Sequence, residues 1–233
     1  MKIAIIPARG GSKRIPRKNI KVFCGQPMLA YSIKAAQSSG CFDRVIVSTD
    51  DNEIAEVARS LGAEVPFIRP SELANDHAGT LPVIKHAIEW FDAQNESPEE
   101  VCCLYATAPF MQADAIKKAY KQLLQTQADY CFTVTSFAFP IQRAVKITQE
   151  GRMEMFYPKH FNTRSQDLEE AYHDAGQFYW GKAEAFREQK PLFSGCSSPY
   201  VLPRHMVQDI DTPEDWKRAE LMYQALKQNG EIV

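Results

Sequence analysis

The chain has 233 residues, of which 45% are hydrophobic, so it is long and apolar enough for one large domain or for one domain with a small insertion. Its net charge is only −2, yet the first 42 residues hold eight Lys or Arg and no Asp or Glu, which indicates one small anionic ligand and argues against a broad nucleic-acid-binding face. No apolar stretch approaches the ~20 residues of a membrane span, and we therefore expect a cytoplasmic protein without a membrane partner.

The first predicted element is a buried strand at Met1–Ile6, an apolar run that stops at a proline. The loop that follows, Pro7–Asn19, holds two adjacent glycines, a serine and five cationic side chains, but no carboxylate. Glycines let backbone N–H groups converge on phosphate oxygens, and Arg9, Lys13 and Lys18 can donate charge-assisted hydrogen bonds. The loop fits neither the P-loop nor the Rossmann dinucleotide pattern. We predict a polyanion site here, with a solvated basic turn as the alternative.

Beyond this loop, the chain alternates between predicted helices and strands. The helices are expected at Pro27–Ser38, Asp51–Leu61, Thr80–Phe91 and Gln112–Gln125, and the strands at Arg44–Asp50, Glu64–Ile68, Glu100–Tyr105 and Tyr130–Thr135. This alternation predicts an α/β fold, in which an open, mostly parallel nucleotide-binding sheet has helices on both faces. Such sheets bind ligands at the carboxyl ends of their strands, where the loop with the cationic side chains lies.

Three more loops follow predicted strand ends and are candidate walls of the same site. They are residues 48–51, the segment that starts at Arg69 and includes Asp76, and residues 106–110. Arg69 lies between Ile68 and Pro70 at the end of a predicted strand, where an unpaired cation would be costly. An ordinary polar turn between strand and helix is the alternative for each loop.

The stretch Ile6–Asn19, which reads IPARGGSKRIPRKN, resembles the signature loop of the acylneuraminate cytidylyltransferases, which make CMP-activated acidic sugars. The similarity extends to about Trp216, close to the end of the chain. The resemblance implies a nucleotidyltransferase that moves CMP from CTP to the anomeric hydroxyl of a nine-carbon 2-keto acid sugar and releases pyrophosphate.

On this interpretation, Arg9 and Lys18 are the catalytic side chains, because they hold the triphosphate and stabilise the charge of the departing pyrophosphate. In the resembled family, the residues that match Asn19 and Arg69 contact the cytidine. The predicted nucleotide-binding residues are Ala8, Gly10, Gly11, Ser12, Lys13, Asn19, Arg69 and Thr80.

The alternation of helices and strands stops between Pro140 and Tyr172. In the resembled family, this region is a dimerisation subdomain that reaches the site of the neighbouring subunit, so we expect a homodimer. The expected organisation is a nucleotidyltransferase domain made of residues 1–139 and 173–233, with an inserted arm at 140–172 that contributes to the sugar pocket. A surface loop region with a strand pair is the alternative.

Three segments, residues 140–144, 164–169 and 173–180, resemble the branch of the family that acts on pseudaminic acid. In addition, Tyr105 and Phe110 stand where the sialic acid branch tends to have Gln and Arg. The sugar would present a carboxylate, acyl-amido groups and an apolar ring face to the protein. The predicted sugar-binding residues are Tyr105, Arg143, Arg164, Gln177 and Tyr179.

Asp209 and Asp211 flank one apolar residue, and on an extended segment this spacing points both carboxylates to one face. Thr212, Pro213 and Asp215 resemble a capping box that opens a C-terminal helix, which leaves the two preceding acids without a visible structural role. Two neighbouring carboxylates favour a bound cation, and in the resembled family this D-x-D holds the metal. We therefore predict Mg²⁺, which Mn²⁺ can replace. Two solvated acids are the alternative.

Other functions remain open at this stage. The sugar could be sialic or legionaminic acid instead of pseudaminic acid. A metal-dependent glycosyltransferase with a nucleotide-sugar donor, or a non-catalytic nucleotide-binding module, would also combine an α/β sheet with a basic loop. The long cationic stretch favours a triphosphate over the diphosphate of a sugar donor, and a binding module would not need the distant carboxylate pair.

Overall fold

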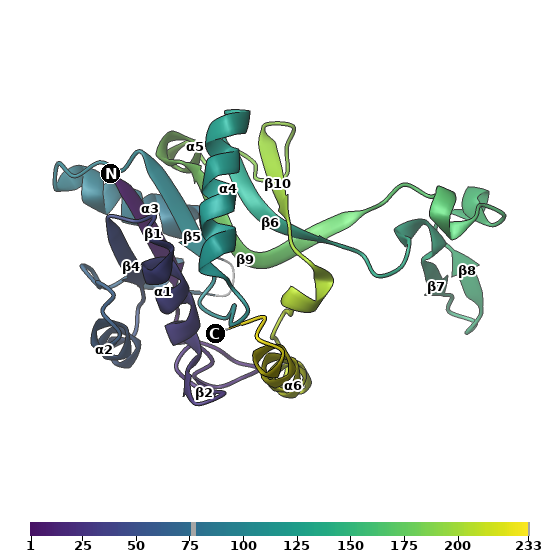
Figure 1. The fold of residues 1–233 in the computed structure, drawn as a ribbon, viewed down its shortest axis with the longest axis horizontal. Helices are drawn as coiled ribbons and strands as arrows, with labels where there is room; N and C mark the ends of the chain where they lie inside the picture. Colours follow the sequence, from purple (N-terminus) through teal and green to yellow (C-terminus); the bar gives the residue numbers. More distant parts are fainter. Residues whose placement is uncertain (76–77, 233) are drawn as a thin grey trace.

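The computed structural model describes residues 1–75 and 78–232, and Asp76, named above in a candidate loop, lies outside them. A six-stranded sheet forms the centre of the molecule (Figure 1). In spatial order, its strands are β10 (Ser197–Val201), β6 (Tyr130–Ser136), β9 (Tyr172–Lys182), β5 (Glu100–Leu104), β1 (Lys2–Pro7) and β4 (Arg44–Ser48). Within this sheet, as far as the structure describes it, β9 runs antiparallel to both of its neighbours and the other pairs are parallel. The predicted open, mostly parallel sheet is confirmed.

Helices cover both faces of the sheet, as predicted. One face carries α1 (Met28–Ser39), α2 (Asn52–Ser60) and α4 (Ala113–Thr126), and the other carries α3 (Thr80–Ala93) and α5 (Ala183–Arg187). Strand β1 shows the cause, because Ala4 and Ile6 join one buried cluster whereas Ile3 and Ile5 join the other. Burial on both faces explains why this strand reads as a continuous apolar run. No helix in the described part of the chain is long and apolar enough to cross a membrane.

Short elements connect these layers. They are the hairpin of β2 (Val22–Phe23) and β3 (Gln26–Pro27), the hairpin of β7 (Val145–Ile147) and β8 (Met153–Met155), and the 3₁₀ helices η1 (Ser71–Leu73), η2 (Ile141–Arg143), η3 (Pro158–His160), η4 (Ser165–Asp167) and η5 (Arg204–Met206). The last helix, α6 (Pro213–Gln228), begins with the predicted capping box. The Thr212 hydroxyl accepts a hydrogen bond from the Asp215 N–H, and the Asp215 carboxylate accepts one from the Thr212 N–H.

Helix α6 packs against the N-terminal part of the chain. The Trp216 ring meets the Phe23 ring edge-on, with the two centroids 5.4 Å apart. Ile210 joins the same buried cluster as Ile15, which belongs to the loop after β1. Residues 209–211 are therefore held beside the loop that the sequence identified as the anion site.

The prediction of a strand at Glu64–Ile68 is wrong. In the structure, this segment pairs with β4 and the residue after it through isolated bridges, one from Glu64 to Ile46 and one from Ile68 to Thr49. Pro66 lies between the two bridges and has no N–H to donate, so the ladder is interrupted and the segment forms an irregular edge of the sheet.

The sequence analysis predicted neither of the last two strands of the sheet, β9 and β10, and β9 has the more unexpected position. It is 11 residues long and lies between β5 and β6, and its register with β6 shifts between Phe132 and Val134. Gly181 permits its close packing, because a Cβ at this position would lie 2.5 Å from the Tyr130 ring. A strand that returns from an insertion can enter the sheet between two earlier strands, and the alternation of helices and strands carries no signal for this.

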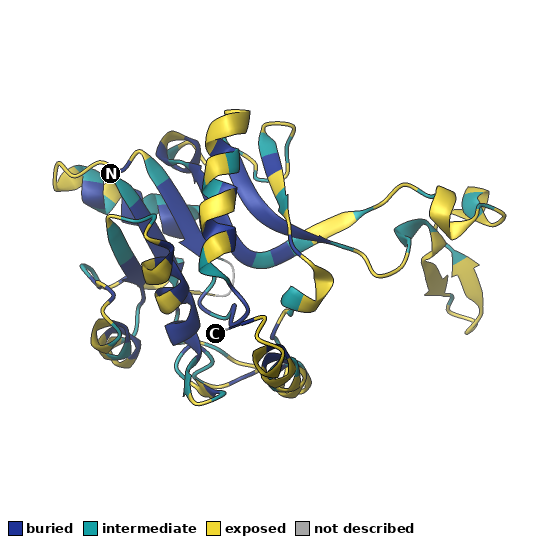
Figure 2. Cartoon of the chain, in the orientation of Figure 1, coloured by how far each residue is buried: buried dark blue, intermediate teal, exposed yellow. Residues whose placement is uncertain are grey.

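Strands β6 and β9 lead out of the sheet toward residues 140–172, which we call the arm (Figure 1). The arm extends away from the sheet and its surface is largely exposed (Figure 2). It carries large apolar side chains in the open, including Ile147 and Met153, which are 78% and 79% exposed. Ile147 and Met153 are register partners in the β7–β8 hairpin, so these two exposed apolar side chains are neighbours.

Candidate active site

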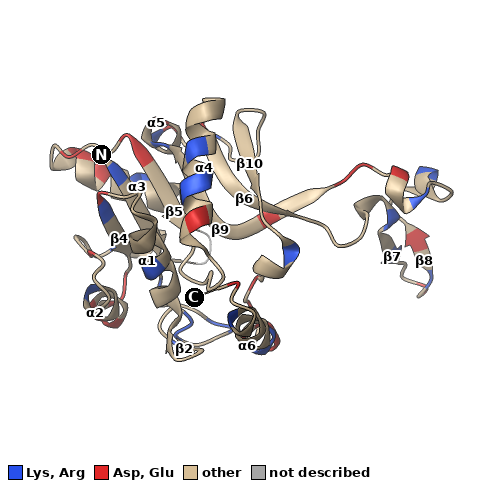
Figure 3. Cartoon of the chain, viewed as in Figure 1, with Lys and Arg blue, Asp and Glu red and all other residues tan. Residues whose placement is uncertain are grey.

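A cavity of about 260 Å³ lies at the carboxyl ends of β1 and β5, where a parallel sheet places its ligand. Its walls come from the loop Pro7–Asn19, which we call the cationic loop, from the Arg69 segment, from the start of α3, from the residues after β5 and from the segment before α6. Figure 3 shows the Lys and Arg segments of the cationic loop beside β2 and α6. The predicted site residues that line the cavity are Arg9, Ser12, Lys13, Lys18, Asn19, Arg69, Thr80, Tyr105 and Asp211.

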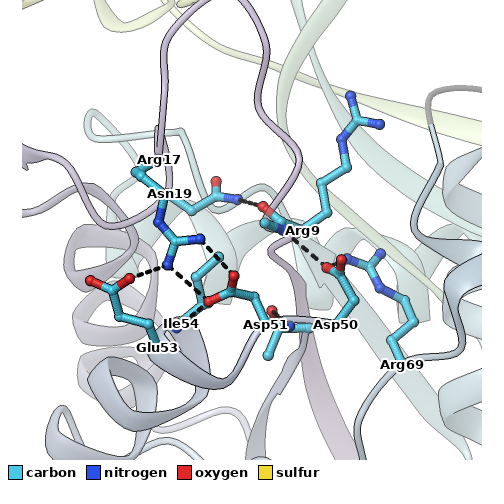
Figure 4. A network of polar contacts seen from close by, with 10 residues as sticks. Arg9, Arg17, Asn19, Asp50, Asp51, Glu53, Ile54 and Arg69 are labelled. Atoms are coloured by element: carbon cyan, nitrogen blue, oxygen red, sulfur yellow. Dashed lines mark hydrogen bonds and ion pairs between the residues drawn. The ribbon is translucent and has the colours of Figure 1, made fainter.

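Hydrogen bonds within the cationic loop and to the loop after β4 fix its shape. Asn19 is buried, and its Nδ2 donates to the Arg9 carbonyl at 2.9 Å, which joins the two ends of the loop (Figure 4). The Gly10 N–H donates to Asp50 Oδ1 at 3.0 Å. A Cβ on Gly10 would lie 2.8 Å from the Asp51 carboxylate, so this close approach requires a glycine.

Arg17 anchors the cationic loop to the start of α2 and does not line the cavity (Figure 4). Its guanidinium donates to both oxygens of Asp51, at 2.6 and 2.9 Å, and also to Glu53. These hydrogen bonds lower the pKa of Asp51 to about 2. Arg17 has a φ of 56°, a left-handed conformation that is unfavourable for a residue with a Cβ, and the ion pairs offset this cost. One of the loop's cations therefore has a structural role.

Arg69 is a buried cation on another wall of the cavity, with a side chain that is only 3% exposed. Its Nη2 lies 3.8 Å from the Asp50 carboxylate. Within the described residues, neither Nε nor Nη2 has a hydrogen-bond partner. Burial lowers the pKa of the Arg69 guanidinium, and the charge of Asp50 opposes this effect. Buried donors without acceptors are costly, so this side chain is suited to a ligand that brings acceptor atoms into the cavity.

Asp211 closes the cavity from the side of α6. Its carboxylate lies 2.8 Å from the Arg14 guanidinium and 3.4 Å from Lys18 Nζ, and the same Nζ donates to the Ile210 carbonyl at 2.8 Å. The sequence analysis saw no structural role for Asp211, and the structure gives it one, because two cations of the loop pair with it. These contacts depend on the packing of α6 against the N-terminal segment.

The geometry therefore combines a cationic loop, a buried arginine with unfilled donors and a carboxylate in one strand-end cavity. The sequence matches the cytidylyltransferase family over residues 3–224. The chain belongs to the cytidylyltransferase family. It is 49% identical to a pseudaminic acid cytidylyltransferase of Campylobacter jejuni subsp. jejuni serotype O:2, with 95% of each chain covered. It is 31% identical to a CMP-N,N'-diacetyllegionaminic acid synthase of Legionella pneumophila, with 94% of each chain covered.

Among solved structures, this cytidylyltransferase is similar to CMP:2-keto-3-deoxy-manno-octonic acid synthetase complexed with CTP. The TM-score is 0.71 and the alignment covers 97% of this chain and 99% of the other, at 16% sequence identity. At that identity the likeness shows the fold alone.

Asp209 and Asp211 are the two carboxylates predicted to hold a divalent cation in this cytidylyltransferase. Asp209 does not line the cavity, and burial, followed by the negative charge of Asp211, raises the pKa of its carboxyl group. In the described part of the chain, no three His, Cys, Asp or Glu side chains come together as a metal site. Two carboxylates with the remaining positions left to phosphate and water oxygens suit Mg²⁺, so the residues present fit the metal predicted above.

A second part of the cavity wall is uncharged and contains Tyr105, which packs against Tyr179. Thr80 Oγ1 and Tyr105 Oη are 3.2 Å apart, and the Tyr105 ring lies 5.4 Å from the ring of Tyr179. The Tyr179 hydroxyl donates to Asp174. Burial raises the pKa of both tyrosines, so they remain neutral hydrogen-bonding groups. Tyr105 lines the cavity. Tyr179 is buried and does not line it, and its contact with the site is through the Tyr105 ring.

The other predicted sugar residues are not gathered at the cavity of the described chain. Gln177 is buried, and its Nε2 donates to the Met206 carbonyl at 2.6 Å. Arg143 lies in η2 of the arm and donates to the Thr163 carbonyl at 2.6 Å, and Arg164 precedes η4 in the same arm. Since the arm points away from the sheet (Figure 1), these two arginines stand apart from the site of their own chain.

The remaining predicted residues lie in the cationic loop beside the cavity, whereas some residues without a predicted role line the cavity. Ala8, Gly10 and Gly11 lie in the cationic loop without lining the cavity. Arg14 and Thr107 line it, although neither was assigned a role. Both lie in loops that the sequence analysis had marked, after the first strand and after Glu100–Tyr105, so position at a strand end was the available signal.

Proposed function

We propose that this cytidylyltransferase transfers CMP from CTP to the anomeric hydroxyl of pseudaminic acid and releases pyrophosphate. The observation that carries the proposal is the 49% identity to a pseudaminic acid cytidylyltransferase over 95% of both chains. The two relatives are named for different sugars, and the one named for diacetyllegionaminic acid is only 31% identical to this chain. The higher identity to the other relative favours pseudaminic acid.

The cationic loop is suited to the triphosphate. Arg9, Lys13 and Lys18 line the cavity together with Ser12, and phosphoryl transfer depends mainly on positioning and on neutralisation of charge. On this proposal, Arg9 and Lys18 act on the reacting phosphates and the departing pyrophosphate. Gly10 and Gly11 do not line the cavity, and the Gly10 N–H donates to Asp50, so the charged contacts with the triphosphate would come from side chains.

Arg69 and Asn19 would read the cytosine. The unfilled Nε and Nη2 donors of Arg69 match the carbonyl oxygen of the base. The Asn19 Nδ2 donates to the Arg9 carbonyl, and the Asn19 Oδ1 would accept a hydrogen bond from the amino group of the base. A buried donor and a buried acceptor would thus discriminate cytosine from uracil, whose pattern differs at the amino position.

Asp209 and Asp211 would hold Mg²⁺ beside the cavity. When bound, the ion supplies charge neutralisation and polarisation at the reacting phosphate. Two cations of the cationic loop also lie at this place, because Arg14 and Lys18 pair with the Asp211 carboxylate at 2.8 and 3.4 Å.

The arm is the proposed dimerisation element. Its exposed apolar surface suits a second copy of this chain, and in a dimer Arg143 and Arg164 would stand at the partner's cavity rather than at their own. Two arginines from the partner would then be available to bind the sugar carboxylate.

The test is pyrophosphate release from each nucleoside triphosphate with pseudaminic, legionaminic, sialic and ketodeoxyoctulosonic acids in turn. We expect release from CTP with pseudaminic acid and a CMP-sugar as the second product. Release with sialic or legionaminic acid at a higher kcat/KM would replace the sugar in the proposal. Absence of release with every pair would overturn it.

A further inference from the structure

Asp50, the second residue after β4, connects two walls of the cavity. Its Oδ1 accepts the Gly10 N–H at 3.0 Å and lies 3.8 Å from Arg69 Nη2. Figure 4 shows Asp50 between the backbone of the cationic loop and the Arg69 side chain. One carboxylate oxygen is therefore shared by the loop that would bind the triphosphate and the arginine that would bind the base. Asp50 itself does not line the cavity.

The charge of Asp50 matters because of where Arg69 lies. The Arg69 side chain is 3% exposed, and Arg9 is a second cation near enough to disfavour its charge. A buried guanidinium without a counter-ion is strongly unfavourable. Asp50 is the acidic group that the structure places against it, and this contact holds the Arg69 charge at the cavity before any ligand arrives.

The hydrogen bond to Gly10 has a separate effect. The Gly10 backbone packs closely against the Asp51 side chain, because a Cβ on Gly10 would lie 2.8 Å from its carboxylate. The neighbouring Asp50 carboxylate accepts the Gly10 N–H at 3.0 Å. Together, these contacts fix the position of the cationic loop relative to the carboxyl end of β4.

We propose that Asp50 is a positioning residue that sets the spacing between the triphosphate loop and the base-reading arginine, so that one CTP can satisfy both. This inference rests on the proposed roles of Arg69 and of the cationic loop. Asp50 does not touch the substrate, and it acts through Gly10 at one end and through Arg69 at the other.

Two substitutions separate the two effects. Asp50→Asn keeps an oxygen that can accept the Gly10 N–H but removes the charge beside Arg69, whereas Asp50→Ala removes both. By isothermal titration, we expect Asp50→Asn to weaken cytidine binding by about tenfold and to change the binding of inorganic tripolyphosphate by less than about twofold. We expect Asp50→Ala to weaken the binding of both probes. With CTP, the KM should rise more than kcat falls in both variants.

Asp43→Asn is the matched control. Asp43 Oδ2 accepts the Lys2 N–H at 2.6 Å, so it makes the same kind of bond between the residue before β4 and the first residue of β1, but at the amino ends of these two strands and away from the cavity. This variant should bind cytidine and tripolyphosphate as the wild type does. Equal losses in Asp43→Asn and Asp50→Asn would show that sheet stability, and not the site, is responsible, and would overturn the inference.

Arg69→Ala distinguishes this inference from the proposed function. If Asp50 acts through Arg69, adding Asp50→Asn to Arg69→Ala should cause no further loss of cytidine affinity, whereas independent roles would give additive losses and would overturn the inference. If Arg69→Ala weakens cytidine binding while Asp50→Asn leaves it unchanged, the proposed base contact stands and the role of Asp50 is wrong. If Arg69→Ala leaves cytidine binding unchanged, the proposed base contact itself fails, and the inference with it.

Discussion

The Lys18 ammonium lies 3.4 Å from the Asp211 carboxylate, although the two residues are 193 positions apart in the sequence. The same nitrogen donates to the Ile210 carbonyl at 2.8 Å. Lys18 therefore has two roles, because it lines the cavity and also ties the cationic loop to the segment before α6. Together with Arg14, which also pairs with Asp211, Lys18 joins the N-terminal and C-terminal segments of the site.

Replacing Lys18 by Ala should lower turnover by more than about tenfold, because a lost charge-assisted contact is worth ~1.5–3 kcal/mol. The measurement is steady-state pyrophosphate release. Lys21→Ala is the control, since Lys21 lies over the Trp216 ring, 4.5 Å from its centroid, and does not line the cavity. Wild-type turnover in a folded Lys18→Ala protein would mean that the charge of the loop is not used in the reaction.

Asp209→Ala and Asp211→Ala should each fold normally and lose most activity. The ion pairs of Asp211 with Arg14 and Lys18 are partly exposed, so their loss should cost no more than about 1 kcal/mol of stability. EDTA should inactivate the wild type until Mg²⁺ or Mn²⁺ is returned. Glu214→Ala is the control, because Glu214 is an exposed acid in the same segment. Full activity of either Asp variant in metal-free buffer would contradict the metal site.

Charges placed on the arm should dissociate the proposed dimer. Ile147→Asp and Met153→Asp each put a carboxylate on an apolar side chain that is more than three-quarters exposed in the single chain, at 78% and 79%. Light scattering should then give the mass of one chain, with loss of activity. Leu221→Asp, on α6 and 61% exposed, is the control outside the arm. A fully active single-chain species would show that the site does not need the partner's arginines.

Asp51→Asn should reduce stability in a pH-dependent way. The folded-state pKa of Asp51, about 2, lies below its ordinary value of 3.8, so the carboxylate contributes stability above about pH 4 and the contribution is lost as the pH falls toward 2. Urea unfolding should show a loss of about 1 kcal/mol at neutral pH that shrinks below pH 4. Asn still caps α2, whereas Asp51→Ala should lose about a further 1 kcal/mol with the hydrogen bond from Ile54. A pH-independent difference would argue against the ion pair with Arg17.

Much of this site is readable from the sequence because parallel strands end at one edge. Arg9, Lys18, Arg69 and Tyr105 each lie shortly after or at the end of a predicted strand, and the structure places all of them on one cavity. Asp50 also lies in a loop that the sequence analysis marked. Its particular role could not be predicted, because the contact with Gly10 and Arg69 depends on how three loops are stacked.

Other features depend on contacts that leave no local pattern. The capping box predicts where α6 begins but not that Trp216 packs on Phe23, and without that contact the pairing of Asp211 with Arg14 does not follow. The position of β9 between β5 and β6 is likewise a matter of topology. The strand at Glu64–Ile68 failed for a local reason, since Pro66 lacks the N–H that a ladder needs.

The packing of Trp216 on Phe23 also determines when the active site can be completed during translation. A chain leaves the ribosome with its N-terminal end first, so β1 and the cationic loop are synthesised long before α6. Asp211 can reach Arg14 and Lys18 only after α6 has been made and has docked. A nascent chain that already contains the whole sheet therefore still lacks one wall of its cavity. The ability to bind CTP should appear only when synthesis is almost finished.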